Sequence, residues 1–471
     1  MKRPKVGILT FSDGRPHMHQ SLLPVTRGFQ ERLGARLEAA GWDVVAGRDI
    51  VWTTDLAQQE ARYLAAQGVE AVVFNYGIWA FPHFSAIASG FVPHPILLLS
   101  NVNPQYPGLV AMLAAAGSLD QIGVFHGRIS GDIADDAVFG RVLRFLRPAM
   151  AKNRLRGEVY GLIGGRSMGM YTAVPALDQW QRQFGIDIEH IDQYEIVRRS
   201  EAMPDSRVAA GVAWLERNGA TIHYDGKLLT PALLHRQLKS YLAVRELLAE
   251  WRCAFCGIKG QPEMTNHFAT MDVAEALLND PYDWEGPHDP IVCATEADSD
   301  GALTMEIFKH LAGTPVLFAD VRHYDAADDV WDLCNSGEHA TYFAGRSFDP
   351  TVNLKRVHLY PADVYFPAGG ASVMHVAAPG PVTLARLARR EGRYWLAIVP
   401  GEFVEFPPEV AQAKAAATTP VWPHAFARFR VPPEVFLAEY DSNHIHGVYG
   451  DYVEDLVWAA KMLGIEHRVF A

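Results

Sequence analysis

The alternation of short apolar runs with amphipathic segments is the feature that most constrains the fold of this chain. Two helical segments, at 21–41 and 55–68, have the spacing of helices packed on a sheet. The apolar runs that read as β-strands are KVGILTF (5–11), WDVVAG (42–47), EAVVFNYG (70–77) and PILLLSN (95–101). Strands that alternate with helices form a parallel sheet covered on both faces. The first third of the sequence therefore predicts an α/β domain.

The same alternation resumes after a long helix predicted at 136–155, and it fades near residue 330. Beyond that point, short strands separated by Gly and Pro turns predict a small barrel-like unit. A chain of 471 residues is too long for one core. We therefore expect an α/β protein with two Rossmann-like parallel-sheet domains, at 1–153 and 154–328. A smaller β-rich C-terminal domain is expected at 329–471.

Charge and composition exclude several classes of function. The net charge of −12 without a basic tract argues against nucleic acid as the main partner. No apolar stretch approaches the roughly 20 residues of a membrane helix, and the first apolar run is typical of a strand and not of a signal peptide. Four cysteines in a chain this long do not make a disulfide framework. A cytoplasmic protein is the expectation, with cysteines that serve packing.

Two apolar runs on either side of one predicted helix each end on a carboxylate. PIVCATE ends at Glu296, TPVLFAD ends at Asp320, and the helix lies at 301–313. Strand, helix and strand in one unit predict that the two strands are parallel, with a right-handed crossover. As sheet neighbours they would be about 4.8 Å apart, and both acids would lie at the ligand-binding edge of one sheet. Carboxylates this close favour a shared proton or a divalent cation such as Mg²⁺ or Mn²⁺. The alternative is helix capping, for which residues 298–300 are better placed.

A histidine that could complete such a site lies in AEYDSNHIHGVYGDYVEDL (438–456). Asn443, His444 and His446 are predicted to lie in a glycine-bearing turn before the last helix. One histidine with two carboxylates is typical of an open catalytic metal site that keeps positions for substrate. The spacing alone does not distinguish His444 from His446.

Long consecutive motifs in the middle of the chain resemble the core of the L-fucose isomerases, which are relatives of the L-arabinose isomerases. These motifs are FCGIKGQ (255–261), DVAEALLNDPYDWEG (272–286), PIVCATEADSDGALTM (290–305) and LFADVRHY (317–324). Shorter motifs follow in the family's order, namely DGR (13–15), GGRSMGM (164–170), YFPAGG (365–370), VWP (421–423) and SNH (442–444). The resemblance covers all three predicted domains and is densest from about 250 to 325.

The resemblance implies a metal-dependent aldose–ketose isomerase that acts through an enediol on an aldose such as L-fucose or D-arabinose. It implies that Glu296, Asp320 and His444 hold Mn²⁺, with Mg²⁺ or Co²⁺ as substitutes, and that the two carboxylates are the acid/base pair. The substrate contacts that it implies are Arg15, Trp79, Gln261, Tyr365, Trp422 and Asn443. It also implies a homo-oligomer, a hexamer or a trimer, with active sites shared between subunits.

Several alternatives remain open from the sequence. The same chemistry could serve L-arabinose or an anionic sugar such as a sulfonated hexose, and Arg166 is a cation that would favour an anion. A non-catalytic sugar-binding protein is the alternative from another class. The sequence does not distinguish which carboxylate takes the proton from C2, or an enediol route from a hydride shift.

Overall fold

The computed structural model describes residues 2–101, 104–336 and 339–471. The chain forms two compact units. Unit 1 consists of Met1–Arg156 and Glu454–Leu463, and unit 2 of Gly157–Val453 and Gly464–Ala471. The boundaries expected for three domains stay a prediction.

Unit 1 is built on a parallel sheet of five strands in the order β2-β1-β3-β4-β5. The strands are β1 (Lys5–Phe11), β2 (Asp43–Ala46), β3 (Ala71–Tyr76), β4 (Ile96–Asn101) and β5 (His126–Gly131). Strands β1, β3 and β4 are buried along nearly their whole length, as strands covered on both faces are. The strand order reverses between β1 and β3. The loops after these two strands therefore form the edge where open α/β sheets bind ligands.

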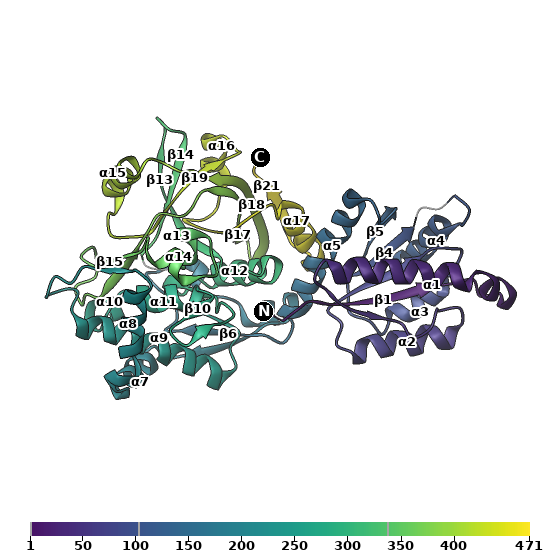
Figure 1. Ribbon diagram of the computed structural model, residues 1–471, viewed down its shortest axis with the longest axis horizontal. Coiled ribbons are helices and arrows are strands. Elements are labelled where there is room, and N and C mark those ends of the chain that lie inside the picture. The colour runs from purple at the N-terminus through teal and green to yellow at the C-terminus, as the bar shows by residue number, and fades with distance from the viewer. Residues whose placement is uncertain (1, 102–103, 337–338) are drawn as a thin grey trace. The chain divides into compact units, whose positions relative to one another are not determined.

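Helices cover both faces of this sheet. They are α1 (Pro16–Ala39), α2 (Thr54–Ala66), α3 (Pro82–Ser89), α4 (Gly108–Gln121), α5 (Asp136–Leu155) and α17 (Val453–Leu463). One apolar cluster joins the sheet to α1, α5 and α17, and a second joins it to α2, α3 and α4. Figure 1 shows α1 and α2 on opposite sides of β1. The predicted parallel-sheet α/β fold is confirmed here.

Unit 2 begins with a second parallel sheet, in the order β12-β9-β6-β7. Its strands are β6 (Val159–Ile163), β7 (Asp187–Ile191), β9 (Phe255–Ile258) and β12 (Cys293–Ala294). The smaller pairings of this unit use β8 (Thr221–Ile222), β10 (Tyr282–Asp283), β11 (Gly286–Pro287), β15 (His358–Pro361) and β16 (Ala371–Met374). The second predicted parallel sheet is therefore present.

A seven-stranded sheet forms the β-rich part of unit 2, in the order β17-β20-β13-β14-β19-β18-β21. Its strands are β13 (Leu317–Asp325), β14 (Val330–Cys334), β17 (Gly380–Arg390), β18 (Arg393–Phe403), β19 (His424–Phe429), β20 (His444–Tyr449) and β21 (Glu466–Val469). All its neighbours are antiparallel except β18 and β21. Because β17 also pairs with β18, six strands close into a partial ring. This confirms the predicted barrel-like sheet.

The prediction that the strands ending at Glu296 and Asp320 are parallel sheet neighbours is wrong. β12 belongs to the four-stranded sheet, whereas β13 lies antiparallel between β20 and β14 in the seven-stranded sheet. The helix between them, α12 (Ser299–Ala312), is as predicted, with Gly313 in a left-handed conformation at its end. This helix carries the chain from one sheet to the other, and the rule for crossovers within one sheet does not apply.

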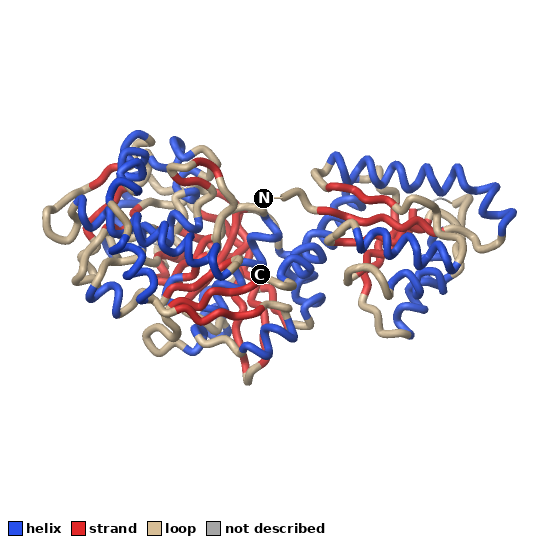
Figure 2. Tube along the Cα trace, turned by 90° about the horizontal axis from the view of Figure 1, so that it is seen from below, coloured by secondary structure: helices blue, strands red, loops and turns tan. Residues whose placement is uncertain are grey.

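The remaining helices of unit 2 surround its sheets, which Figure 2 draws in red. They are α6 (Leu177–Gln183), α7 (Tyr194–Ala202), α8 (Ala209–Arg217), α9 (Pro231–Trp251), α10 (Glu263–His267), α11 (Asp272–Asn279), α13 (Tyr342–Gly345), α14 (Pro350–Leu354), α15 (Pro408–Thr418) and α16 (Pro433–Glu439). Among the residues described, no helix combines the length and the apolar character needed to cross a membrane.

Candidate active site

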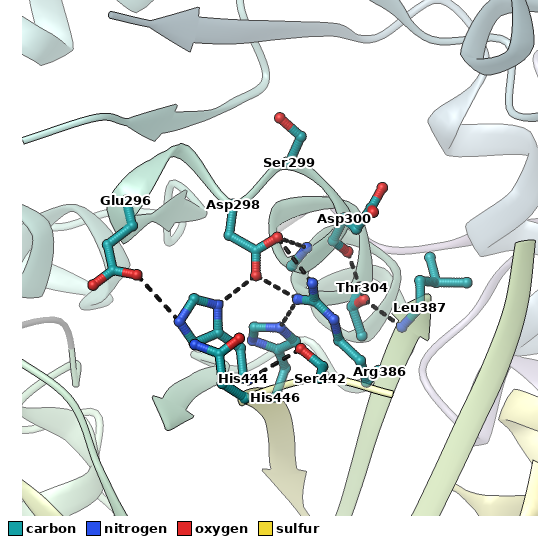
Figure 3. Close-up of polar contacts among 12 residues, drawn as sticks. Glu296, Asp298, Ser299, Asp300, Thr304, Arg386, Leu387, Ser442, His444 and His446 are labelled. Carbon is teal, nitrogen blue, oxygen red and sulfur yellow. Dashed lines mark hydrogen bonds and ion pairs between the residues drawn. The ribbon is translucent and has the colours of Figure 1, made fainter. Parts of the chain in front are cut away.

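Glu296 was predicted to lie at the end of a strand, but it lies in a strained turn. The strand β12 stops at Ala294, and a 3-10 turn, Thr295–Ala297, follows it. Glu296 and Ala297 have φ angles of 57° and 51°. This left-handed region costs a residue with a side chain about 1–2 kcal/mol, and such residues concentrate at functional sites. The turn directs the Glu296 carboxylate toward His444 (Figure 3).

Asp320 lies within β13 and not at its end, because the strand continues to Asp325. Its backbone pairs with His444 on the neighbouring strand β20. The amides of Asn335 and Asn443 donate hydrogen bonds of 3.0 and 3.1 Å to the two carboxylate oxygens. Burial raises the pKa of Asp320, and the nearby Glu296 charge adds to the rise, although His444 and Asn443 oppose it.

His444 is fully buried and opens strand β20, which replaces the turn expected there. Its Nε2 lies 3.3 Å from Glu296 Oε2 and 3.4 Å from Asp320 Oδ1. Its Nδ1 lies 2.7 Å from Asp298 Oδ2. Burial alone would lower the pKa of His444, but its interactions with Asp298, Glu296 and Asp320 outweigh burial and raise the pKa to about 10.

His446, the alternative from the sequence, lies on the same strand but faces a different group. Because Arg386 can only donate, its Nη1 gives a hydrogen bond of 2.9 Å to His446 Nε2. Burial, followed by the Arg386 charge, lowers the pKa of His446 well below its usual value. The rings of His444 and His446 both pack against Phe318, at centroid distances of 4.5 and 4.7 Å. Of the two, it is His444 that the structure places beside the carboxylates.

The chemistry of Glu296, Asp320 and His444 fits a divalent cation. Two carboxylates and one imidazole nitrogen are a common catalytic donor set. Nε2 of His444 is buried and faces the carboxylates of Glu296 and Asp320, at 3.3 and 3.4 Å. A buried imidazole nitrogen that faces two carboxylates marks the position that a shared cation would take once the proton on that nitrogen has left.

A second cluster of ligand-type side chains lies elsewhere in unit 2, and the sequence did not predict it. Nε2 of His310 lies 2.9 Å from Glu158 and 3.2 Å from Glu306. Glu158, Glu306 and His310 each offer one ligand atom, and these three atoms all lie within 4.8 Å of one another. Among the described residues, this is the group of three ligand-type side chains that lies so close together. Glu296, Asp320 and His444 are thus more widely spaced, and the two carboxylates would have to approach each other to share a cation. Since Lys309 lies 2.5 Å from Glu306, the second cluster already holds a positive charge.

The sugar-contact residues predicted in unit 2 fall into two groups. Gln261 donates a hydrogen bond of 3.4 Å to Glu296, and Asn443 bonds Asp320, so both lie beside the carboxylates. Tyr365 is 73% exposed, and its ring centroid lies 6.5 Å from that of the buried Trp422. Trp422 packs in one cluster with Cys334, whose backbone pairs with Asp320. The pair of aromatic residues is thus linked to the strand that carries Asp320.

Arg15 and Trp79 lie in unit 1, in the loops that follow β1 and β3. These loops form the ligand-binding edge of the five-stranded sheet. The Arg15 side chain is 55% exposed and forms an ion pair of 2.6 Å with the buried Asp13. Trp79 is partly buried against the apolar cluster beneath this edge. Both predicted residues therefore lie where a ligand of unit 1 would bind.

Three residues of the site were not predicted as functional from the sequence. Asp298 appeared there only as a helix cap, which it is, because it accepts a hydrogen bond of 3.1 Å from Gly301 N. Arg386 lies 88 positions further along the chain, and its ion pair with Asp298 has no local signal. Asn335 follows β14 and orients Asp320. Only the spatial arrangement identifies these partners.

Comparisons with known proteins find the same family in three separate parts of the chain. Residues 3–157 match the first N-terminal domain of L-fucose isomerase, residues 236–313 its second N-terminal domain and residues 333–470 its C-terminal domain. The L-fucose isomerase of Bacteroides thetaiotaomicron is 25% identical over 98% of this chain and 93% of its own length. That of Vibrio vulnificus is 28% identical over 86% of both chains. That of Citrobacter koseri is 25% identical over 98% of this chain and 92% of its own.

Proposed function

The chain belongs to the L-fucose isomerase family of aldose–ketose isomerases, and we propose that it converts an aldose such as L-fucose or D-arabinose into its ketose at a divalent-cation site. Glu296, Asp320 and His444 would hold the cation, Mn²⁺ in the first place and Mg²⁺ or Co²⁺ as substitutes. The observation that supports this most is the convergence of two carboxylates on the buried Nε2 of His444.

The reaction moves a proton from C2 to C1 and another between the two oxygens of the sugar. The cation would supply Lewis-acid stabilisation of the negative charge that develops on those oxygens. One of the two carboxylates takes the proton from C2, and it or its partner returns a proton to C1, so that an enediol is the intermediate. The strained turn at Glu296 and the two amide donors at Asp320 hold both carboxylates in defined orientations.

The predicted sugar contacts have the chemistry that such a substrate needs. Tyr365 and Trp422 would offer aromatic walls to the weakly apolar C–H faces of the sugar, and Gln261 and Asn443 would bond its hydroxyl groups. We further propose a homo-oligomer, a hexamer or a trimer, in which Arg15 and Trp79 of one subunit serve the carboxylates of a neighbouring subunit.

The first experiment is an assay of ketose formation by chelator-treated protein with and without Mn²⁺. The panel holds L-fucose, D-arabinose, L-arabinose and a sulfonated hexose. Turnover that depends on Mn²⁺ and disappears in Glu296→Gln supports the proposal, and the preferred aldose identifies the sugar class. Equal turnover in treated and reloaded protein contradicts it. In heavy water, an enediol route incorporates deuterium into the product, whereas a hydride shift does not.

Subunit mixing tests the shared active site. Arg15→Ala and Glu296→Gln are each expected to lower turnover as pure proteins. If Arg15 serves the site of a neighbour, hybrid oligomers contain some sites with both native residues, and mixing restores part of the activity. A mixture no more active than the sum of its parts, in oligomers shown by mass labelling to exchange subunits, contradicts the shared site.

A further inference from the structure

Asp298 holds the face of His444 that points away from the carboxylates. The Asp298 side chain is fully buried, and its Oδ2 lies 2.7 Å from His444 Nδ1 (Figure 3). An ionised carboxylate can only accept a hydrogen bond, so Nδ1 carries the proton and donates it. Nε2 is then the nitrogen that faces Glu296 and Asp320.

Arg386 forms a bidentate ion pair with Asp298, and both side chains are buried. Its Nη1 and Nη2 donate to the two oxygens of Asp298 at 2.5 and 3.0 Å, and the Arg386 side chain is 1% exposed. A bidentate pair of this kind fixes the orientation of the carboxylate as well as its charge.

The packing around this network leaves no room for a side chain at Gly301. A Cβ atom built there would lie 2.8 Å from Asp298 Oδ2, 2.9 Å from Arg386 Nη1 and 2.9 Å from His446 Cε1. Gly301 lies in the first turn of α12, and its N–H donates to Asp298 Oδ1. The start of the helix thus packs closely against the Asp298 carboxylate, the Arg386 guanidinium and the ring of His446.

We propose that Asp298 is a positioning residue for the cation site: together with Arg386 it fixes the tautomer and ring orientation of His444 so that Nε2 faces Glu296 and Asp320. The inference rests on the proposed function, because a cation is what this orientation would serve. A carboxylate behind a ligating histidine is a common second partner of metal sites, and its loss typically lowers metal affinity about 10- to 100-fold.

Asp298→Asn separates this role from helix capping. Asparagine caps helices as well as aspartate does, so the Gly301 contact can persist while the charge is lost. The matched control is Asp300→Asn. Asp300 is equally buried and two positions away, but it bonds Arg389 at 3.0 Å and Tyr394 at 2.7 Å instead of His444.

Gly301→Ala tests the same network without removing any polar group, and it decides the matter if Asp298→Asn does not fold. Its control is Gly140→Ala in α5, where a Cβ would have nothing within 4 Å. In both helices alanine is favoured over glycine in intrinsic propensity. A loss confined to Gly301→Ala therefore reports crowding of Asp298 and Arg386.

The measurements are Mn²⁺ affinity by calorimetry and the electron spin-echo signal of an imidazole nitrogen bound to Mn²⁺. We expect Asp298→Asn and Gly301→Ala to weaken Mn²⁺ binding about 10- to 100-fold and to alter the nitrogen signal, with both controls within about threefold of the native protein. Native affinity and signal in Asp298→Asn or Gly301→Ala overturn the inference. If the native protein binds no Mn²⁺, or binds it equally well in Glu296→Gln, it is the proposed function that fails.

Discussion

Replacing Asp320 by asparagine tests its carboxylate with little change of shape. The two oxygens of Asp320 accept hydrogen bonds from Asn335 and Asn443. Asparagine has one acceptor oxygen, so its own amide nitrogen would face one of these donors. Losing a hydrogen bond to a charged group costs about 1.5–3 kcal/mol. For an interaction that orients a cation ligand, this corresponds to about a 10- to 100-fold loss of affinity.

The same substitution removes a proton acceptor. Loss of a general base typically lowers rates about 10²- to 10⁴-fold. We therefore expect Asp320→Asn to lower kcat/KM about 10³-fold at saturating Mn²⁺, measured as ketose formation, and to raise the Mn²⁺ dissociation constant at least about tenfold, measured by calorimetry.

The matched control is Asp332→Asn on the neighbouring strand β14. Asp332 is also a buried acid, and it lies 2.8 Å from both His424 and Thr418. Its substitution should leave kcat/KM within about threefold of the native value. An Asp320→Asn protein that binds Mn²⁺ and keeps about a tenth or more of the native kcat/KM would refute the acid/base role of Asp320.

Three further predictions concern protons and sugar. Because the pKa of His444 is raised to about 10, a bound cation must displace a proton from its ring. Calorimetry in several buffers should therefore show about one proton released per Mn²⁺. The Mn²⁺ affinity should rise about tenfold per pH unit between pH 7 and 9. No proton release would contradict this. Burial raises the pKa of Asp280 from 3.8 to about 7. Between about pH 4 and pH 7, Asp280 therefore binds more protons in the folded state than in the unfolded state, and the free energy of unfolding falls as the pH rises. At pH 8, Asp280→Asn should therefore be about 2–4 kcal/mol more stable than the native protein, and differential scanning fluorimetry should show a higher melting temperature. This difference in melting temperature should disappear near pH 4. A difference that does not depend on pH would be contrary evidence. Tyr365→Ala should raise KM about tenfold with little change in kcat or melting temperature, because the side chain is 73% exposed; an unchanged KM would remove Tyr365 from the sugar site.

Hydrophobic periodicity predicts much of the fold. The helix expected at 136–155 is α5 with the same bounds, and the run 5–11 is β1. Helices α3 and α4 were not predicted from the sequence. Helix α4 is apolar on nearly all sides, with Leu109, Val110 and Leu113 exposed, so it lacks the two-sided pattern that identifies a surface helix.

The assignment of strands to sheets could not be read from local patterns. The order of strand, helix and strand around α12 suggested one parallel sheet, but β12 and β13 join different sheets. The membership of β13 is decided by its pairing with β20, which lies more than 100 residues further along the chain. Such long-range pairings depend on the whole fold.

The sequence predicted the ligand-type residues of the candidate site but not the residues that bond to them. Glu296, Asp320 and His444 carry recognisable motifs, and the structure brings them together, although their role as metal ligands stays a prediction. Asp298 fits a helix cap so well that its sequence position gives no hint of its bond to His444. Its partner Arg386 lies inside a strand without any motif.

The most direct test of the account is a stepwise Mn²⁺ titration of metal-free protein while ketose formation from the preferred aldose is followed. The account predicts that activity rises in proportion to bound Mn²⁺ and levels off at about one cation per subunit, as one site requires. Glu296→Gln and Asp320→Asn should stay inactive over the same range. Full activity before any Mn²⁺ is added, or activity restored equally in these two variants, would contradict it.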